Sequence, residues 1–129
     1  MELQIHIDPP SNGSQRVALG GRLDTNSYAE FDRQLEPLLA GMQSLLLDLS
    51  ELVYISSAGI RSIFRVRKAL AGHAGKVLVL NPQPQIQKVF DVVKAVPLNE
   101  IFSSAAEADA YLDAMQSKVL RGGDDDEGY

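Results

Sequence analysis

The sequence contains no cysteine and no tryptophan, and it has no apolar run long enough to cross a lipid bilayer. Without cysteine, disulfides, a thiol nucleophile and cysteine-ligated metal sites are excluded, and nothing indicates an oxidising compartment. A membrane span needs roughly 20 apolar residues in a row, and the N-terminal segment lacks the basic start and apolar centre of a signal peptide. We therefore expect a soluble, unprocessed, cytoplasmic protein without a membrane partner.

The chain also has fewer basic than acidic residues. The chain has 12 Lys and Arg against 17 Asp and Glu, a formal net charge of −5 and a sequence pI near 4.9. This balance argues against a nucleic-acid backbone or an anionic membrane surface as the main partner and favours a protein or a small ligand. Part of the negative charge lies in residues 121–129, which lack apolar periodicity, so we expect a disordered, solvated tail rather than a docking segment.

A chain of 129 residues with 45% apolar content suits a single core, and we expect one domain over residues 1–120. Alternating apolar residues on either side of a turn signal at 9–13 predict a β-hairpin. Apolar runs at 45–49 and 76–81 are typical of buried parallel strands. Helical spacing predicts helices from a cap at Thr25 or Asn26 to Gly41, from Ser57 to about Leu70, from Pro82 or Pro84 through Val93, and from Ser103 to about Val119, with a short strand or turn at Ile101–Phe102. The order indicates an α/β fold with a mixed, mostly parallel sheet and about four helices.

Catalytic signals are weak. His6 and His73 stand far apart and show no metal-ligand spacing. The glycines do not form a phosphate-binding loop, and Ser56-Ser57-Ala58-Gly59 lacks the first glycine of a nucleophile elbow. We expect no enzyme activity, no metal and no cofactor.

Ser57 stands at a strand-to-helix junction, at or next to a helix N-cap. Serine is a preferred N-cap, and its replacement by alanine costs about 1 kcal/mol. Taken alone, this position favours a structural cap.

The segments Gly21-Arg22-Leu23-Asp24, Leu46-Leu47-Asp48-Leu49 and Ile55-Ser56-Ser57-Ala58-Gly59-Ile60 resemble landmarks of the STAS family, the sulfate transporter and anti-sigma factor antagonist domains. The resemblance extends from residue 1 to about 119. In the family signature D-S-[SA]-G-[IL], the serine after the acidic position is the phosphoacceptor, and here it is Ser57. Ser56 stands where the family often has aspartate, and this makes Ser56 an alternative acceptor.

The resemblance implies a partner switch. The unphosphorylated protein binds an anti-sigma factor that is also a serine kinase of the histidine-kinase-like ATPase type, phosphorylation of Ser57 ends that complex, and a metal-dependent phosphatase restores the serine. The partner-binding residues implied are Asp24, Ser56, Ser57, Ala58, Gly59, Arg61 and Arg65, with Asp24 expected to be the carboxylate nearest the site.

Arg61, Arg65 and Lys68 form a basic stripe at i+4, i+8 and i+11 from Ser57. Such a stripe is either a solvated helix face or a docking edge for an acidic partner. A second function also stays open, because the missing aspartate at position 56 is compatible with a non-phosphorylated STAS subunit of a larger assembly such as a lipid-transport complex.

Overall fold

The computed structural model describes residues 2–95 and 102–122. Its elements follow one another as β1 (Gln4–Ile7), β2 (Ser14–Leu23), α1 (Tyr28–Leu39), β3 (Ser44–Ile55), α2 (Ser57–Ala71), β4 (Lys76–Leu80), α3 (Pro84–Ala95) and α5 (Ala105–Leu120). None of the described helices is long and apolar enough to span a membrane.

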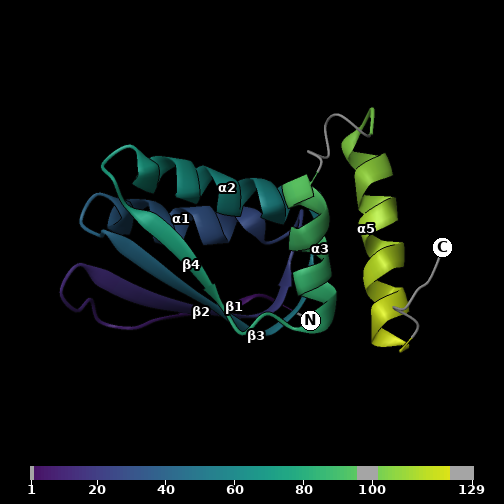
Figure 1. The fold of residues 1–129 in the computed structure, drawn as a ribbon, viewed down its shortest axis with the longest axis horizontal. Helices are drawn as coiled ribbons and strands as arrows, with labels where there is room; N and C mark the ends of the chain where they lie inside the picture. The colour runs from purple at the N-terminus through teal and green to yellow at the C-terminus, as the bar shows by residue number, and fades with distance from the viewer. Residues whose placement is uncertain (1, 96–101, 123–129) are drawn as a thin grey trace.

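The four strands of the described residues form one sheet in the order β1-β2-β3-β4. The β1–β2 hairpin is antiparallel, and the β2–β3 and β3–β4 pairs are parallel. In Figure 1, α1 and α2 lie side by side along the sheet, and α3 and α5 stand at the end where α2 begins. The predicted α/β fold with a mixed, mostly parallel sheet is therefore confirmed.

The main core lies between the sheet and the α1–α2 layer. Every second residue of the first half of β3 points into it, because side chains alternate between the two faces of a strand. The fully buried residues include Leu45, Leu47 and Leu49 from β3, Val17 and Leu19 from β2, and Phe31, Leu35 and Leu70 from the helices. The apolar periodicity of the sequence thus identified this core.

The start of α1 differs from the prediction of a cap at Thr25 or Asn26. The helix begins at Tyr28, and Ser27 occupies the N-cap position without a side-chain cap. The Ser27 hydroxyl instead donates to the Arg22 carbonyl oxygen at 2.8 Å and accepts from the Asp24 N–H at 2.9 Å. The polar residues after β2 therefore build a turn before the helix starts.

Strand β3 is longer than the predicted 45–49, since it continues to Ile55. Its second half stays paired with β2 through two register shifts, one between Ala18 and Gly20 and one between Gly21 and Arg22. Strand β4 ends opposite Asp48, so from Ser50 onward the other edge of β3 has no neighbouring strand among the described residues. This exposed end of β3 is where the other elements of the site meet.

Side chains from α3 and the segment before it cover part of that edge. The Gln83 side chain donates to the Ser50 carbonyl oxygen at 2.8 Å, and the Gln85 side chain donates to the Val53 carbonyl oxygen at 3.1 Å. These bonds satisfy backbone groups that a continued β4 would otherwise have paired.

Two predictions fall partly or wholly outside the described residues. Of the predicted short strand or turn, Ile101 lies outside them, and Phe102 is not in a strand. The final helix begins at Ala105, with Ser104 as its N-cap. Of the predicted tail 121–129, Arg121 and Gly122 form a turn, and residues 123–129 lie outside the described part.

Candidate functional site

Ser56, not Ser57, caps α2. Ser56 has extended backbone angles, and its hydroxyl accepts from the Gly59 N–H at 3.4 Å. Ser57 is the first helical residue and makes no cap bond. Of the two predicted places for Ser57, at or next to the N-cap, the structure shows the second, and α2 begins at Ser57 as expected. The Ser56 hydroxyl thus has a structural hydrogen bond, whereas the Ser57 hydroxyl has none among the described residues.

The Ser57 hydroxyl is buried and has no hydrogen-bond partner among the described residues. The residue as a whole is only 5% exposed. An unpaired buried hydroxyl costs free energy, so its presence in a fold that could place alanine there calls for a reason other than stability. A hydroxyl without structural bonds can be modified without the loss of a hydrogen bond.

Ala58 and Gly59 pack the start of α2 against the ends of β2 and β3. Both residues are buried. A Cβ added at Gly59 would lie 2.6 Å from the Leu23 carbonyl oxygen and 2.9 Å from a side-chain carbon of Ile55. A larger residue at this close approach would push the helix away, so these two signature positions shape the site without presenting side-chain surface to a partner.

Helix α5 reaches this junction and contacts it with one carboxylate. Asp109 Oδ1 accepts from the Ser57 backbone N–H at 2.8 Å. This arrangement corrects the expectation that Asp24 would be the carboxylate nearest the site. Asp24 instead pairs with Arg22 at 3.2 Å and accepts from the Asn26 N–H at 3.0 Å.

The same helix anchors the last residue of β3. The Gln116 side chain accepts from the Ile55 N–H at 3.0 Å and donates to the Ile55 carbonyl oxygen at 2.8 Å. Leu112, between the two polar anchors on this face of α5, is fully buried. Sequence reasoning predicted this helix but not its part in the site; the available signal was an aspartate and a glutamine seven residues apart on the face that also carries Leu112.

Negative charge collects around Tyr54, whose ring packs under the Arg22 guanidinium at 4.0 Å. Burial raises the pKa of the Tyr54 hydroxyl, and the nearby carboxylates of Asp113 and Asp109 raise it further. The carboxylates of α5 therefore lie close enough to Tyr54 to disfavour a negative charge on its hydroxyl, although Arg22 acts in the opposite direction.

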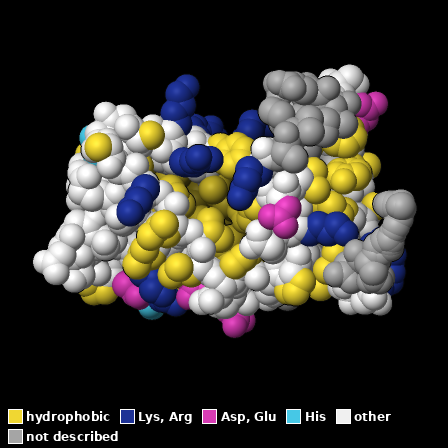
Figure 2. Space-filling model, in the orientation of Figure 1, with side chains coloured by type: hydrophobic (Ala, Val, Ile, Leu, Met, Phe, Trp, Pro, Cys, Tyr) yellow, Lys and Arg dark blue, Asp and Glu magenta, His cyan; other side chains and the backbone are white. Residues whose placement is uncertain are grey.

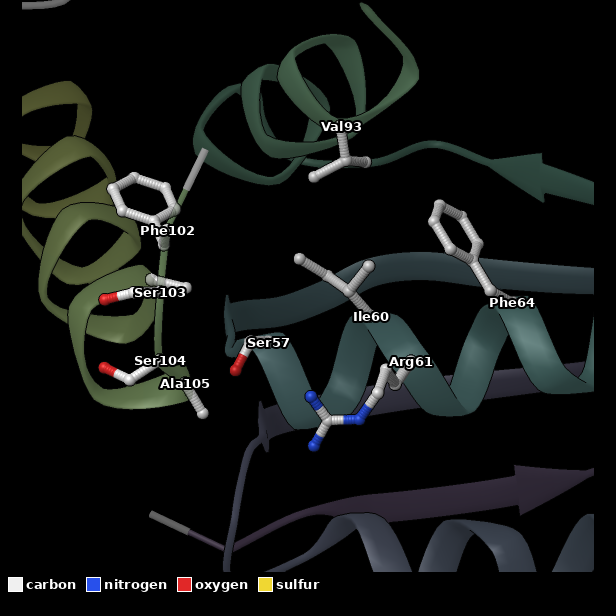
Figure 3. A pocket seen from close by; sticks show the side chains of 10 residues that line it. Ser57, Ile60, Arg61, Phe64, Val93, Phe102, Ser103, Ser104 and Ala105 are labelled. Atoms are coloured by element: carbon white, nitrogen blue, oxygen red, sulfur yellow. The ribbon is translucent and has the colours of Figure 1, made fainter. Parts of the chain in front are cut away.

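Beside Ser57 lies a pocket of about 700 Å³ that α2, α3 and the start of α5 line. Its lining is largely apolar and includes Ile60, Phe64, Val93, Phe102 and Ala108. Figure 3 shows the Ser57 side chain pointing from α2 toward the first turn of α5, with Arg61 beside it. The phosphoacceptor candidate thus forms part of the wall of an apolar hollow that has a cation next to it.

The predicted basic stripe is exposed along α2, since Arg61, Arg65 and Lys68 all face solvent. Arg65 is tied to Asp32 of α1 at 3.2 Å. Arg61 has no hydrogen-bond or ion-pair partner within residues 2–95 and 102–122. Figure 2 shows Lys and Arg side chains around hydrophobic surface over α2 and toward α3, and Arg61 is itself one of the residues that line the apolar hollow.

Metal-ligating clusters are absent from the part of the chain that the structure describes. His6 lies 3.0 Å from Asp8, and His73 contacts the Met42 carbonyl oxygen at 2.9 Å. Both histidines therefore have structural contacts, and neither lines the hollow beside Ser57.

The site thus consists of a serine whose hydroxyl has no hydrogen-bond partner among the described residues, at the start of a helix and next to an apolar hollow. The STAS domain model matches residues 11–108. The chain belongs to the STAS domain family.

Among known proteins, the chain is similar to BtrV of Bordetella bronchiseptica, which is named as an anti-sigma factor antagonist, with 38% identity over 64 residues. The match covers 46% of this chain and 55% of BtrV, so it spans about half of that protein. Bacillus SpoIIAA, an anti-sigma factor antagonist solved in unphosphorylated and phosphorylated forms, shares the fold with a TM-score of 0.60 and 19% identity in both forms. The unphosphorylated form matches over 68% of this chain and 82% of its own. An anti-sigma factor antagonist from Mycobacterium paratuberculosis has a TM-score of 0.62 and 16% identity over 84% of this chain and 95% of its own.

Proposed function

We propose that this protein is an anti-sigma factor antagonist that works by partner switching in the cytoplasm. In its unphosphorylated form it binds an anti-sigma factor that is also a serine kinase of the histidine-kinase-like ATPase type. Phosphorylation of Ser57 ends the complex, and a metal-dependent serine phosphatase reverses the modification. The output of such a cycle is the regulation of transcription.

The observation that carries the proposal is the state of the Ser57 hydroxyl. It stands at the serine position of the family signature and takes part in no structural hydrogen bond among the described residues. Ser56, the alternative acceptor, is already engaged with the Gly59 N–H, so modifying it would remove a helix cap. The names of BtrV and SpoIIAA support the same role.

The proposed modification is a phosphoryl transfer from ATP. The Ser57 oxygen bonds to the γ-phosphorus, the bond to the β–γ bridging oxygen breaks, ADP leaves, and the hydroxyl proton passes to a base on the kinase. The product carries about −1.5 to −2 additional charges at neutral pH. At an interface this dianion must find basic partners or repel its surroundings, and a loss of about 1.4 kcal/mol already weakens binding tenfold.

The surface next to Ser57 indicates what the partner presents. The apolar hollow offers burial for a hydrophobic side chain, and Arg61, exposed and without a partner among the described residues, attracts a carboxylate. Phe64, which is 39% exposed, extends the apolar surface along α2. We infer that the partner inserts an apolar anchor flanked by an acidic residue. We keep Asp24 and Arg65 among the proposed partner-binding residues, at the edge of the contact surface.

The burial of the Ser57 hydroxyl is also the observation that favours the second candidate function. A STAS domain that serves as a fixed subunit of a larger assembly, such as a lipid-transport complex, needs no accessible acceptor. The serine at position 56 in place of the family's aspartate points the same way. The two functions differ in one measurable property, which is whether Ser57 is ever phosphorylated.

Affinity capture from lysate of the source cells, with Ser57→Ala as bait, tests the proposal. Recovery of a histidine-kinase-like ATPase that phosphorylates the wild-type protein supports the proposal, provided that mass spectrometry maps the phosphate to Ser57. Ser57→Ala incubated with the same ATPase is the matched control and should gain no phosphate. Recovery of membrane-transport subunits, together with an unmodified intact mass of the wild-type protein, would overturn the proposal in favour of the fixed subunit.

A further inference from the structure

The phosphoacceptor and the element that covers it come from distant parts of the chain. The Ser57 oxygen is buried, and Ser57 shares its pocket wall with Ala105 and Ala108 of α5. In Figure 3, the Ser57 side chain points toward the first turn of α5. A kinase needs in-line access to this oxygen, and with α5 in this position it has none.

Helix α5 packs on α3 and is also held over the junction by specific hydrogen bonds. Asp109 binds the Ser57 N–H, and Gln116 binds both backbone groups of Ile55. Leu112 is buried between these anchors, and Ala108, next to Asp109, is buried as well. The outer face of α5, including Tyr111, is exposed. A helix attached along one face can separate from the sheet without unfolding the core between β3 and the α1–α2 layer.

Asp109 occupies the place that a phosphate on Ser57 would seek. Free N–H groups and the helix dipole at the start of α2 attract anions, and the Asp109 carboxylate already accepts the Ser57 N–H at 2.8 Å. A phosphoserine dianion would compete for the same group and repel the carboxylate. Both anions cannot bind there together.

We propose that α5 is an autoinhibitory cover for Ser57, locked by Asp109, and that docking of α5 and phosphorylation of Ser57 exclude each other. The inference deepens the proposed function and rests on it for its biological meaning. Kinase access requires α5 to open, and the phosphate then keeps it open. By thermodynamic linkage, whatever stabilises the docked helix disfavours the phosphorylated state by the same factor by which phosphorylation weakens docking.

The cover itself can be tested without any partner. Hydrogen exchange, measured by NMR, reports opening of α5 through its amides and through the Ser57 amide. Asp109→Ala should accelerate exchange of these amides about tenfold, which is the effect of about 1.4 kcal/mol. Asp113→Ala is the matched control, because it removes the same charge one turn farther along α5 without touching Ser57, and it should change exchange by less than about twofold. Asp109→Asn keeps the acceptor oxygen and should give an intermediate effect.

The decisive sample is the full-length protein with phosphoserine placed at position 57 by codon reassignment. Exchange of the α5 amides should accelerate at least about tenfold, and the amides of Leu45 and Leu47 in β3 should keep their protection. Unchanged or slower exchange in α5 would overturn the cover. If α5 opens but the captured ATPase binds the modified and unmodified proteins equally, the proposed function fails and the cover stands. If phosphorylation releases the ATPase and α5 stays docked, the cover alone fails.

Discussion

The side-chain amide of Gln116 pairs with Ile55 as a neighbouring strand would, accepting from its N–H at 3.0 Å and donating to its carbonyl oxygen at 2.8 Å. Both groups belong to the end of β3 that extends beyond β4. One side chain from α5 thus replaces a missing strand and completes the backbone hydrogen bonding next to Ser57.

Removing that amide should cost stability. Gln116→Ala leaves the Ile55 N–H and carbonyl oxygen buried without partners, and each such loss costs about 1–3 kcal/mol. We expect the free energy of unfolding, measured by urea denaturation, to fall by about 2–4 kcal/mol. Gln87→Ala, on the exposed face of α3, is the control and should change it by less than about 0.5 kcal/mol. Equal effects of the two variants would contradict the bridging role.

The two adjacent serines should respond oppositely to alanine. Ser56→Ala removes the cap of α2 and should lower the free energy of unfolding by about 1 kcal/mol. Ser57→Ala removes a buried hydroxyl without a partner among the described residues, so it should be neutral or stabilising. Thermal and urea unfolding of both variants check this. A larger loss for Ser57→Ala than for Ser56→Ala would show that Ser57 has a structural bond after all.

Asp48 should contribute to the acid sensitivity of the fold. Its carboxylate accepts from the Ser50 N–H at 3.0 Å and pairs with Arg16 at 2.5 Å. The Ser50 N–H, aided by Arg16, holds the pKa of Asp48 below its ordinary value of 3.8. A pKa lowered by folding gives stability that is present above the ordinary value and is lost as pH falls through the lower folded value.

We therefore expect Asp48→Asn to narrow the difference between the unfolding free energies at pH 7 and pH 3. Asp91→Asn, on exposed α3, is the matched charge-removing control and should keep the wild-type difference. Urea denaturation at the two pH values measures both. An unchanged difference in Asp48→Asn would mean that the Asp48 contacts do not stabilise the charged carboxylate.

Charge reversal should weaken partner binding more at Arg61 than at Arg65. Arg61 is exposed beside Ser57 without a partner among the described residues, and Arg65 is tied to Asp32. Arg61→Glu should weaken binding to the captured ATPase at least about tenfold, because it turns an attraction into a repulsion at the hollow. Arg65→Glu should have a smaller effect, and surface plasmon resonance compares them. Equal wild-type affinity in both variants would show that the stripe is a solvated face.

Local patterns were sufficient where burial and chain direction decide the structure. The β-hairpin, the alternation through Leu45 and Leu47, and the helix after Ser57 all follow from periodicity and turn residues. The family signature also directed attention to Ser57. These features depend on residues close together in the sequence, and that is why the sequence predicted them.

The predictions that the structure corrected concern contacts between segments that are distant in the sequence. Asp109 meets Ser57 across 52 residues of sequence, and Gln116 meets Ile55 across 61. No local pattern shows which carboxylate reaches a helix N-terminus, so the expectation settled on Asp24. The sequence also left open whether Ser57 or its neighbour caps α2, since two adjacent serines offer equal capping chemistry and the exact end of β3 decides between them.

The most direct test of the switch is a calorimetric titration of the captured ATPase with the protein unmodified and with phosphoserine at position 57. We predict that the phosphate weakens binding at least about tenfold, while Ser57→Ala binds as tightly as the unmodified protein. Equal affinities for all three forms would contradict the central claim that Ser57 controls the complex.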